Sequence, residues 1–438
     1  MVWKKLWIPA VLWIGTLALS HSANGQTHRA SSLYQDLSFL LQEEQLQDGE
    51  LLEYFYYKPH ENRSWFHKAL LWRPFVSIEK DGWQINFNPT YQILSSSEND
   101  AGGFYVNARG LFIQGSLGET FGFTTSVYEC QTNPIYLVGS DFEPHKVYPG
   151  IGKMKLRNPI DIPFFQGEWC WQLSKSIQVV SGYGKMHPKG QQLSSIWSRE
   201  VAAAFYAGAK IGVGRLDADL RLYRAISQNA VGNVIEDGDT FHPGSWGSLA
   251  FVDYWLLENK VLGLTVQSRF TNFSKEDAVG FNDQQLIGAK SKWKGFEAFG
   301  LLGVNKDANS YHVGVWKAIA NRALLKLELF NSDFTTQEYI GVHYGDRPNP
   351  NYQRTTNLIY FGSRVFYKRW ELSGDVYGTD KGANSGLVVN GQLAWTINAS
   401  NFSQLFISTY ENPFVLKSNR VREIRFGFST QLFPQTWR

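Results

Sequence analysis

The chain has 438 residues, of which 18% are charged, and its formal net charge is +3. Aromatic residues make up 15% of it, with 16 Trp, 21 Tyr and 30 Phe, and 40 Gly provide for many turns. This composition favours strands over helices, and the absence of any basic block or stripe excludes a nucleic-acid binder.

The first 25 residues have the pattern of an export signal. Lys4 and Lys5 precede an apolar stretch over 6–19, which is too short to span a bilayer as a helix, and small residues follow at 22–25. We expect a Sec signal peptide over 1–25. No Cys follows the apolar stretch, so a lipoprotein anchor is not expected, and no later apolar run suits a transmembrane helix.

A helical period comes next. Leu33, Leu37 and Leu40 share one helical face behind a possible cap at Ser31 or Ser32, and a second short helical stretch covers 64–72. The sequence therefore predicts a small amphipathic helical segment over 26–82, periplasmic and packed on another part of the molecule.

From residue 83 onward the period changes to two, which predicts a closed antiparallel β-barrel over 83–438. About eighteen strands are expected, at 83–94, 103–116, 121–130, 164–173, 177–184, 200–213, 215–225, 246–257, 261–272, 284–293, 295–304, 311–320, 323–330, 356–367, 369–378, 386–397, 402–411 and 421–433. Each is long enough for a tilted membrane crossing. The expected fold class is all-β, a transmembrane barrel with a small N-terminal helical element.

The connections between these strands alternate in length. Tight turns such as 117–120 and 174–176 follow every second strand, and long polar loops such as 131–163 and 331–355 follow the others. Short turns therefore occupy one rim and long loops the other, as in a barrel inserted from the periplasm. A soluble β-sandwich has no reason to sort its loops in this way.

Polar and apolar side chains alternate along the strands. Over 215–221, one face carries Arg215, Asp217, Asp219 and Arg221, and the other carries leucine and alanine. We interpret the charges as facing inward and the apolar face as facing lipid; a secreted soluble protein with its charges in solvent is the alternative. The other charged residues with the inward phase are Arg109, Arg269, Lys326, Glu328, Glu371, Asp375 and Arg425.

These inward charges are the best candidates for ligand contact in the lumen. Their mixed signs also suit mutual neutralisation across the wall, which is the alternative, because an isolated charge away from water is costly. The last predicted strand ends in Leu432 and Phe433, similar to the aromatic C-terminal signal that the barrel-insertion machinery recognises.

Motifs for catalysis are missing. The chain contains no G-x-S-x-G, H-E-x-x-H, phosphate-loop or Cys-x-x-Cys pattern, so we expect no enzyme activity, cofactor or metal. The two cysteines, Cys130 and Cys170, have the inward phase on neighbouring predicted strands. A disulfide is allowed outside the cytoplasm, and two separate packed thiols are the alternative because the depths differ.

One stretch of residues has a recognisable pattern. It comprises Phe87-Asn88-Pro89, Asn107-Ala108-Arg109-Gly110, Gln114-Gly115-Ser116-Leu117-Gly118, Phe121-Gly122-Phe123, Glu129-Cys130-Gln131 and Pro134-Ile135-Tyr136, preceded by Trp65-Phe66-His67-Lys68. This pattern resembles the capsule assembly protein Wzi family of Bacteroidetes, over roughly the first half of the chain. The resemblance implies a monomeric outer-membrane barrel, occluded by its own helices and loops, that attaches capsular polysaccharide as a surface lectin without enzymatic activity.

The chain departs from this family after residue 181. Members carry a Gly-Tyr-Arg-Ser and a Leu-Ser-Asp pattern, whereas this chain has Gly182-Tyr183-Gly184-Lys185 and then 190–199. Gly182, Gly184, Gly190 and Ser198 correspond, but the arginine and the aspartate are missing. The three glycines, Lys185 and Trp197 are the loop candidates for sugar contact. Trp197, Tyr148 and Trp246 can stack on sugar rings, or equally form a membrane-interface girdle.

The main hypothesis is a non-enzymatic outer-membrane barrel that binds or anchors capsular polysaccharide or exopolysaccharide. The alternative is a substrate-specific, porin-like channel, and an outer-membrane esterase is a third, weaker class. The expected partners are outer-membrane lipid, the polysaccharide and the barrel-insertion machinery, with no nucleic acid.

Overall fold

The computed structural model describes residues 75–97, 105–118, 120–132, 147–148, 152–153, 160–184, 204–225, 245–257, 260–271, 284–293, 295–304, 310–319, 323–332, 356–367, 370–380, 386–398, 403–412 and 421–429, with the single residues 186, 191, 194 and 196. The predicted signal peptide, the helical stretches before residue 75 and the end of the last predicted strand lie outside the described residues. Within these ranges no helix has the length and apolar character needed to cross a membrane.

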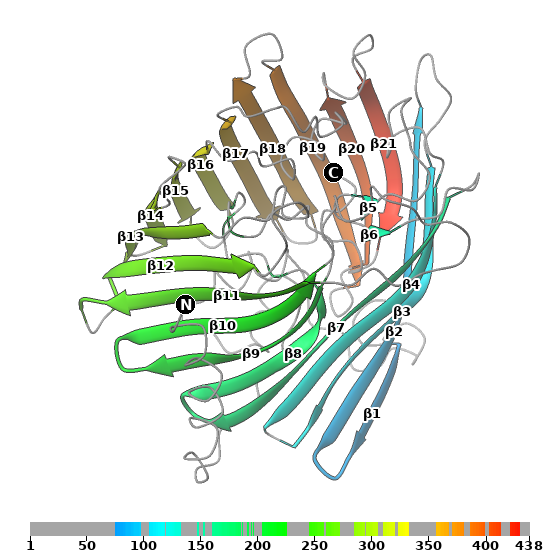
Figure 1. The fold of residues 1–438 in the computed structure, drawn as a ribbon. Helices are drawn as coiled ribbons and strands as arrows, with labels where there is room; N and C mark the ends of the chain where they lie inside the picture. The colour runs from blue at the N-terminus through cyan, green and yellow to red at the C-terminus, as the bar shows by residue number, and fades with distance from the viewer. Residues whose placement is uncertain are drawn as a thin grey trace, which may run out of the picture.

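The strands form one large antiparallel sheet that closes on itself (Figure 1). In chain order they are β1 (Val76–Lys80), β2 (Trp83–Ser97), β3 (Tyr105–Leu117), β4 (Phe121–Thr132), β7 (Ile160–Ser174), β8 (Ile177–Gly184), β9 (Ala204–Val213), β10 (Leu216–Ala225), β11 (Ser245–Trp255), β12 (Leu262–Thr271), β13 (Gln284–Trp293), β14 (Phe296–Gly303), β15 (Ser310–Ile319), β16 (Ala323–Ser332), β17 (Thr356–Tyr367), β18 (Trp370–Asp380), β19 (Gly386–Asn398), β20 (Ser403–Asn412) and β21 (Val421–Ser429).

Closure occurs at β2, which pairs with β3 along its length and with β21 from Gln92 to Ser97. The sheet has 19 strands, and β1 pairs with β2 alone among the described strands, so 18 strands form the ring. The predicted closed barrel of about eighteen strands is confirmed.

One strand was not predicted. β1 pairs with the first part of β2, with Val76 opposite Phe87 and Lys80 opposite Trp83. Between them Asp81 and Gly82 have φ of 48° and 81°, the positive values that a two-residue type I′ turn requires. The predicted helical segment over 26–82 is therefore wrong for 76–80, because this Asp-Gly pair makes a hairpin there.

The two rims differ as predicted. Residues 118–120, 175–176 and 214–215 connect strand pairs tightly at one rim, which we call the turn rim. The other rim, the loop rim, carries long connections such as 133–159 and 333–355. The first of these contains the small hairpin of β5 (Val147–Tyr148) and β6 (Gly152–Lys153).

The outer face of the wall is apolar and exposed. Leu327 and Leu329 on β16 and Leu302 on β14 are exposed, and the exposed large hydrophobics of nearly every strand share their phase. The inner phase carries buried charged residues such as Arg269 and Glu328. A membrane-spanning barrel has apolar side chains on the outside of a closed wall and charged side chains on the inside. The prediction that the charges face inward is therefore confirmed for these strands.

Candidate functional site in the barrel lumen

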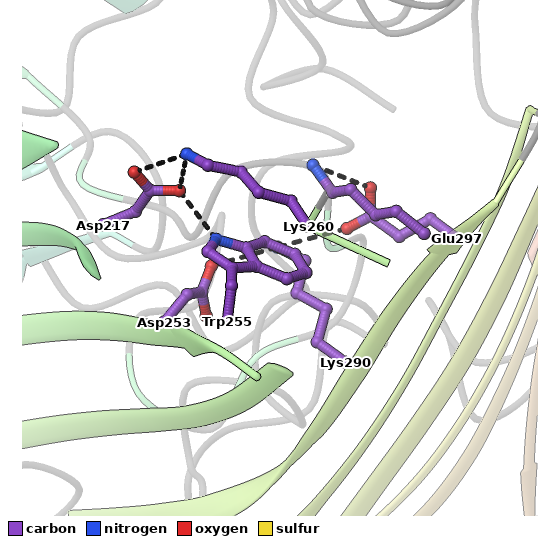
Figure 2. Close-up of polar contacts among 7 residues, drawn as sticks. Asp217, Asp253, Trp255, Lys260, Lys290 and Glu297 are labelled. Atoms are coloured by element: carbon purple, nitrogen blue, oxygen red, sulfur yellow. Dashed lines mark hydrogen bonds and ion pairs between the residues drawn. The ribbon is translucent and has the colours of Figure 1, made fainter. Parts of the chain in front are cut away.

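A cluster of charged side chains lies on the inner wall near the turn rim (Figure 2). We call it the turn-rim cluster. Lys260 Nζ lies 2.9 and 2.8 Å from the two carboxylate oxygens of Asp217, and Trp255 Nε1 donates to the same carboxylate at 2.8 Å. Asp217 is the first inward residue of β10 and Trp255 is the last residue of β11, so the register brings both beside the turn that holds Lys260.

The same cluster continues onto β13 and β14. Lys290 Nζ lies 3.3 Å from Asp253 and 3.2 Å from Glu297, and Lys292 Nζ lies 3.4 Å from Glu297. Lys292 also lies over the Trp255 ring, 5.8 Å from its centroid. Three ammonium groups therefore face three carboxylates, and the cluster carries no net charge.

A second charged group lies on β7, β9 and β10. The Tyr206 hydroxyl donates to Glu168, whose other oxygen lies 3.9 Å from Lys210 Nζ. Arg221 donates twice to Asp219, from Nε and Nη2 at 2.8 Å each, and its guanidinium lies 4.8 Å from the centroid of the Tyr206 ring. Two cations again face two carboxylates.

A third group on β15 and β16 is fully buried. His312 Nε2 lies 3.0 Å from one oxygen of Glu328, and Trp316 Nε1 donates to the other at 3.3 Å. Lys326 lies over the Trp316 ring at 5.6 Å. Because an isolated buried carboxylate would be costly, Glu328 is accommodated by these partners.

Neighbouring strands repeat this arrangement. Arg364 Nε lies 3.7 Å from Glu371 Oε1, and the Tyr360 hydroxyl donates to Asp375 at 2.7 Å. Many inward charges of the described wall thus pair with an opposite charge, as the neutralisation alternative predicted, and others have uncharged partners, such as Tyr360 for Asp375. Within the described part of the chain, no group of three or more His, Cys, Asp or Glu is placed to hold a metal ion.

Several large side chains with the inward phase are fully buried. Trp255, Arg269, Tyr223 and Phe330 are among the largest fully buried side chains of the protein, although all four have the inward phase. A barrel of this strand number is wide enough for an aqueous channel, so a water-filled lumen would leave such side chains exposed. Neighbouring side chains of the wall account for part of this burial: Lys292 lies over the Trp255 ring, the Tyr223 ring lies over Gly247, and Phe330 packs against His312.

Another part of this burial comes from the connection between β8 and β9. Its described residues Met186, Ser194 and Ile196 are buried, and the backbone carbonyl of Ile196 accepts a hydrogen bond from Arg269 Nη1 at 2.8 Å. Arg269 lies on β12, four strands further round the ring than β8. Ile196 therefore lies inside the barrel, against the wall at β12.

Five predicted site residues face inward as expected: Asp217, Asp219, Arg221, Glu371 and Asp375. The lumen assignment of Arg109 is wrong. Its side chain is 61% exposed on the outer face, opposite the exposed Tyr91, and it pairs with the equally outward Glu129 at 3.1 Å. Both charges lie toward the loop rim, beyond the strand positions that must be apolar.

Arg215 is also misassigned, because it lies in the turn before β10 and is exposed, with Nη1 donating to the Leu256 carbonyl at 3.2 Å. Gly182 and Gly184 lie at the end of β8. Lys185, Gly190, Trp197 and the side chain of Arg425 lie outside the described residues. Trp246 is exposed on the outer face at the loop-rim end of β11, which favours the girdle interpretation for it.

Several residues of these groups were missed from the sequence. Lys260 lies in a turn, Tyr206 and Trp255 belong to predicted strands without a motif that marks them, and Ile196 lies in a loop. The partners of Tyr206 and Trp255 depend on which strands pair and in which register. No local signal marks the contact of Ile196 with Arg269.

The two cysteines are not joined. Both face inward and are buried, but Cys130 lies opposite Ile162 of β7, whereas Cys170 of β7 lies opposite Gly122 of β4. Eight residues of strand, about 26 Å at 3.3 Å per residue, separate their levels, far beyond bonding range. The disulfide proposed as one alternative is therefore wrong, and the two packed thiols are observed.

Gly182 has a packing role that a matched pair of variants can test. A Cβ at Gly182 would lie 2.2 Å from the backbone oxygen of Gly167, whereas a Cβ at Gly184 would approach its nearest neighbour, the Tyr206 ring, at 3.9 Å. We expect Gly182→Ala to disturb the pairing of β7 with β8 and to lower the yield of heat-modifiable barrel on gels, while Gly184→Ala folds as the parent. Equal folding of both variants would contradict this.

Comparisons with known proteins show a likeness of architecture. No protein-family model and no curated protein matches the chain. Among solved structures, OccK8 (OprE) of Pseudomonas aeruginosa is 10% identical with a TM-score of 0.45, covering 80% of this chain and 97% of that one. OpdL of the same species is 13% identical with a TM-score of 0.43 and the same coverage, and a triple mutant of the Rhodopseudomonas blastica porin is 9% identical with a TM-score of 0.39, covering 79% and 99%. Because these TM-scores are all below 0.5, the closed antiparallel barrel is established by the strand pairings described above and not by these likenesses.

Proposed function

We propose that this protein is an outer-membrane barrel without enzymatic activity that binds or anchors capsular polysaccharide or exopolysaccharide at the cell surface. The observation that carries the proposal is the covered inner wall. Large side chains such as Arg269 and Phe330 are buried, and many inward charges have partners on the wall. Free diffusion through a wide pore does not suit such a wall, whereas a stable platform for loops at the surface does.

The resemblance in β2 to β4 supports the same proposal. Pro89, Arg109, Gly110 and Cys130, which belong to the residue pattern that resembles the Wzi family, all lie on these three consecutive strands. The exposed ion pair of Arg109 and Glu129 lies at their loop-rim ends. Loops with glycine and aromatic residues at that rim can present polar groups and ring faces to a sugar chain.

A substrate-specific channel is the second candidate, and the turn-rim cluster favours it. Lys260 and Asp217 are 45% and 38% exposed, so this part of the lumen meets water. A channel that passes small charged solutes would use paired lysines and carboxylates in such a place.

The two functions are separated by one pair of measurements. Deletion of the gene is expected to release polysaccharide from the cell surface, and a plasmid copy is expected to restore it. The purified protein in planar bilayers is expected to be silent. Steady conductance together with normal polysaccharide retention in the deletion strain would replace the anchoring function by the channel.

A further inference from the structure

A row of outward side chains crosses five neighbouring strands near the loop rim, and we call it the outer row. It consists of Phe165 on β7, Tyr183 on β8, Phe205 on β9, Arg224 on β10 and Trp246 on β11, strands that lie side by side in the ring (Figure 1). Tyr183 lies opposite Phe205, and Arg224 lies between Phe205 and Trp246 in the strand register. The centroid of the Tyr183 ring lies 6.0 Å from that of Phe165 and 4.6 Å from that of Phe205. Four aromatic side chains and one guanidinium group therefore share one level of the outer face.

Arg224 is the unusual member of this row. It is exposed, and the residues directly opposite it on the two neighbouring strands, Phe205 and Trp246, are exposed aromatic side chains. Arg109, another outward arginine, pairs with Glu129, whereas no carboxylate of the described ranges pairs with Arg224. A positive charge at the border of an apolar surface attracts the anionic headgroups of lipids.

The outer row lies where the apolar band of the wall ends. On β10, the outward residues from Leu216 to Leu222 are leucine and alanine, and Arg224 follows as the last outward residue but one position from the end of the strand. Aromatic girdles mark the membrane interfaces of barrels, and the loop rim of a barrel inserted from the periplasm faces the cell surface. The row is therefore at the level of the headgroups of the outer leaflet.

Three kinds of group in and below the row select one class of lipid. A guanidinium group binds phosphate through paired, charge-assisted hydrogen bonds. Aromatic rings pack against the apolar faces of sugar rings. Below the row, Leu222 has the small residues Ala207 and Ser248 opposite it on the outer face, so acyl chains can lie against the wall there. A lipid with a phosphorylated sugar as its headgroup uses all three features, whereas a glycerophospholipid leaves the aromatic rings without a sugar.

We propose that the outer row binds an outer-leaflet glycolipid with a phosphorylated sugar headgroup. Arg224 holds the phosphate, and the rings of Phe205 and Trp246 lie beside the sugar. The site is on the outer wall, so it is separate from the lumen and does not depend on the proposed attachment of polysaccharide. A lipid bound there fixes the depth of β9, β10 and β11 in the outer leaflet.

Arg224→Gln tests the site. The full-length protein in detergent is titrated with diphosphoryl lipid A, a phosphorylated glucosamine lipid, and native mass spectrometry gives the fraction of protein with one lipid bound. We expect Arg224→Gln to bind it about tenfold more weakly than the parent, because the charged partner of the phosphate is lost. Arg224→Lys keeps the charge and is expected to recover part of the affinity. Phe205→Leu removes one ring and keeps the arginine, and it is expected to bind about threefold more weakly.

Lys317→Gln is the matched control for the loss of one positive charge. Lys317 is an exposed, outward residue of β15 near the turn rim and lies opposite Phe296. This variant is expected to bind lipid A as the parent does, and heat-modifiable mobility on gels checks that every variant folds.

Equal affinity of the parent and Arg224→Gln would overturn the proposal, and so would a parent that binds no lipid A. A parent that binds phosphatidylglycerol as tightly as lipid A would also overturn it, because the row would then attract any anionic lipid. The proposed function fails separately, through normal polysaccharide retention in the deletion strain.

Discussion

Replacement of Glu328 by leucine is expected to destabilise the barrel, because each of the two buried donors that lose their acceptor costs about 1–3 kcal/mol. Glu328 is completely buried and accepts from both His312 and Trp316. Leucine would leave the Trp316 indole N–H and a histidine ring nitrogen buried without their acceptor. The temperature at which the folded gel band disappears, and the guanidinium midpoint followed by tryptophan fluorescence, measure the loss.

Two controls separate this effect from simple repacking. Glu328→Gln keeps the shape and one acceptor oxygen, so it is expected to fall between the parent and the leucine variant. Leu329→Ala changes the next outward residue of β16 and leaves the buried group intact, so its effect in detergent is expected to be small. A leucine variant as stable as the parent would mean that the buried group contributes nothing to the wall.

The architecture of the barrel followed from the sequence because each strand repeats the same two-faced pattern. On β16, for example, the outer face carries Leu325, Leu327 and Leu329, and the inner face carries Lys326 and Glu328. This assignment does not depend on which strand lies beside it. Turn residues then separate the strands. An error in one strand leaves the count of the others intact, which is why about eighteen strands and the sorting of turns and loops were predicted correctly.

The alternation pattern predicted the wrong face for side chains at positions where the outer surface is no longer apolar. At the loop-rim end of β3, Arg109 shares its face with Leu111, and the polar-apolar contrast that marks the inner face is lost. β1 was not predicted because the leucines that precede it have a helical period, although the Asp81–Gly82 pair is itself a hairpin signal.

The contacts between inward side chains could not be predicted from the sequence, for a different reason. Lys260 meets Asp217 from 43 positions along the chain, and Tyr206 meets Glu168 from 38 positions. Such contacts depend on strand order and register together. Alternation alone identifies which side chains face inward and is silent on which of them meet, so the candidate list contained Asp217 without Lys260 or Trp255.

Replacement of Leu327 by arginine tests whether the outer face of the barrel wall lies in the hydrocarbon of a membrane. Leu327 lies in the middle of β16 and is 44% exposed on the outer face. If this face meets hydrocarbon, a charge there is expected to cost about 2–4 kcal/mol in lipid vesicles, and about 0–1 kcal/mol close to the membrane interface. Trp246→Arg, at the loop-rim end of β11, is therefore the matched control and is expected to fold nearly as well as the parent.

Refolding into vesicles, followed by the fraction of heat-modifiable protein against guanidinium concentration, gives both values in one series. Leu327→Phe keeps the position apolar and is expected to behave as the parent, which shows that size is not the cause. If Leu327→Arg and Trp246→Arg were equally stable in lipid, the middle of β16 would not lie in hydrocarbon. The inward charges would then need an explanation that does not involve a membrane, and the proposal of a platform at the cell surface would be contradicted.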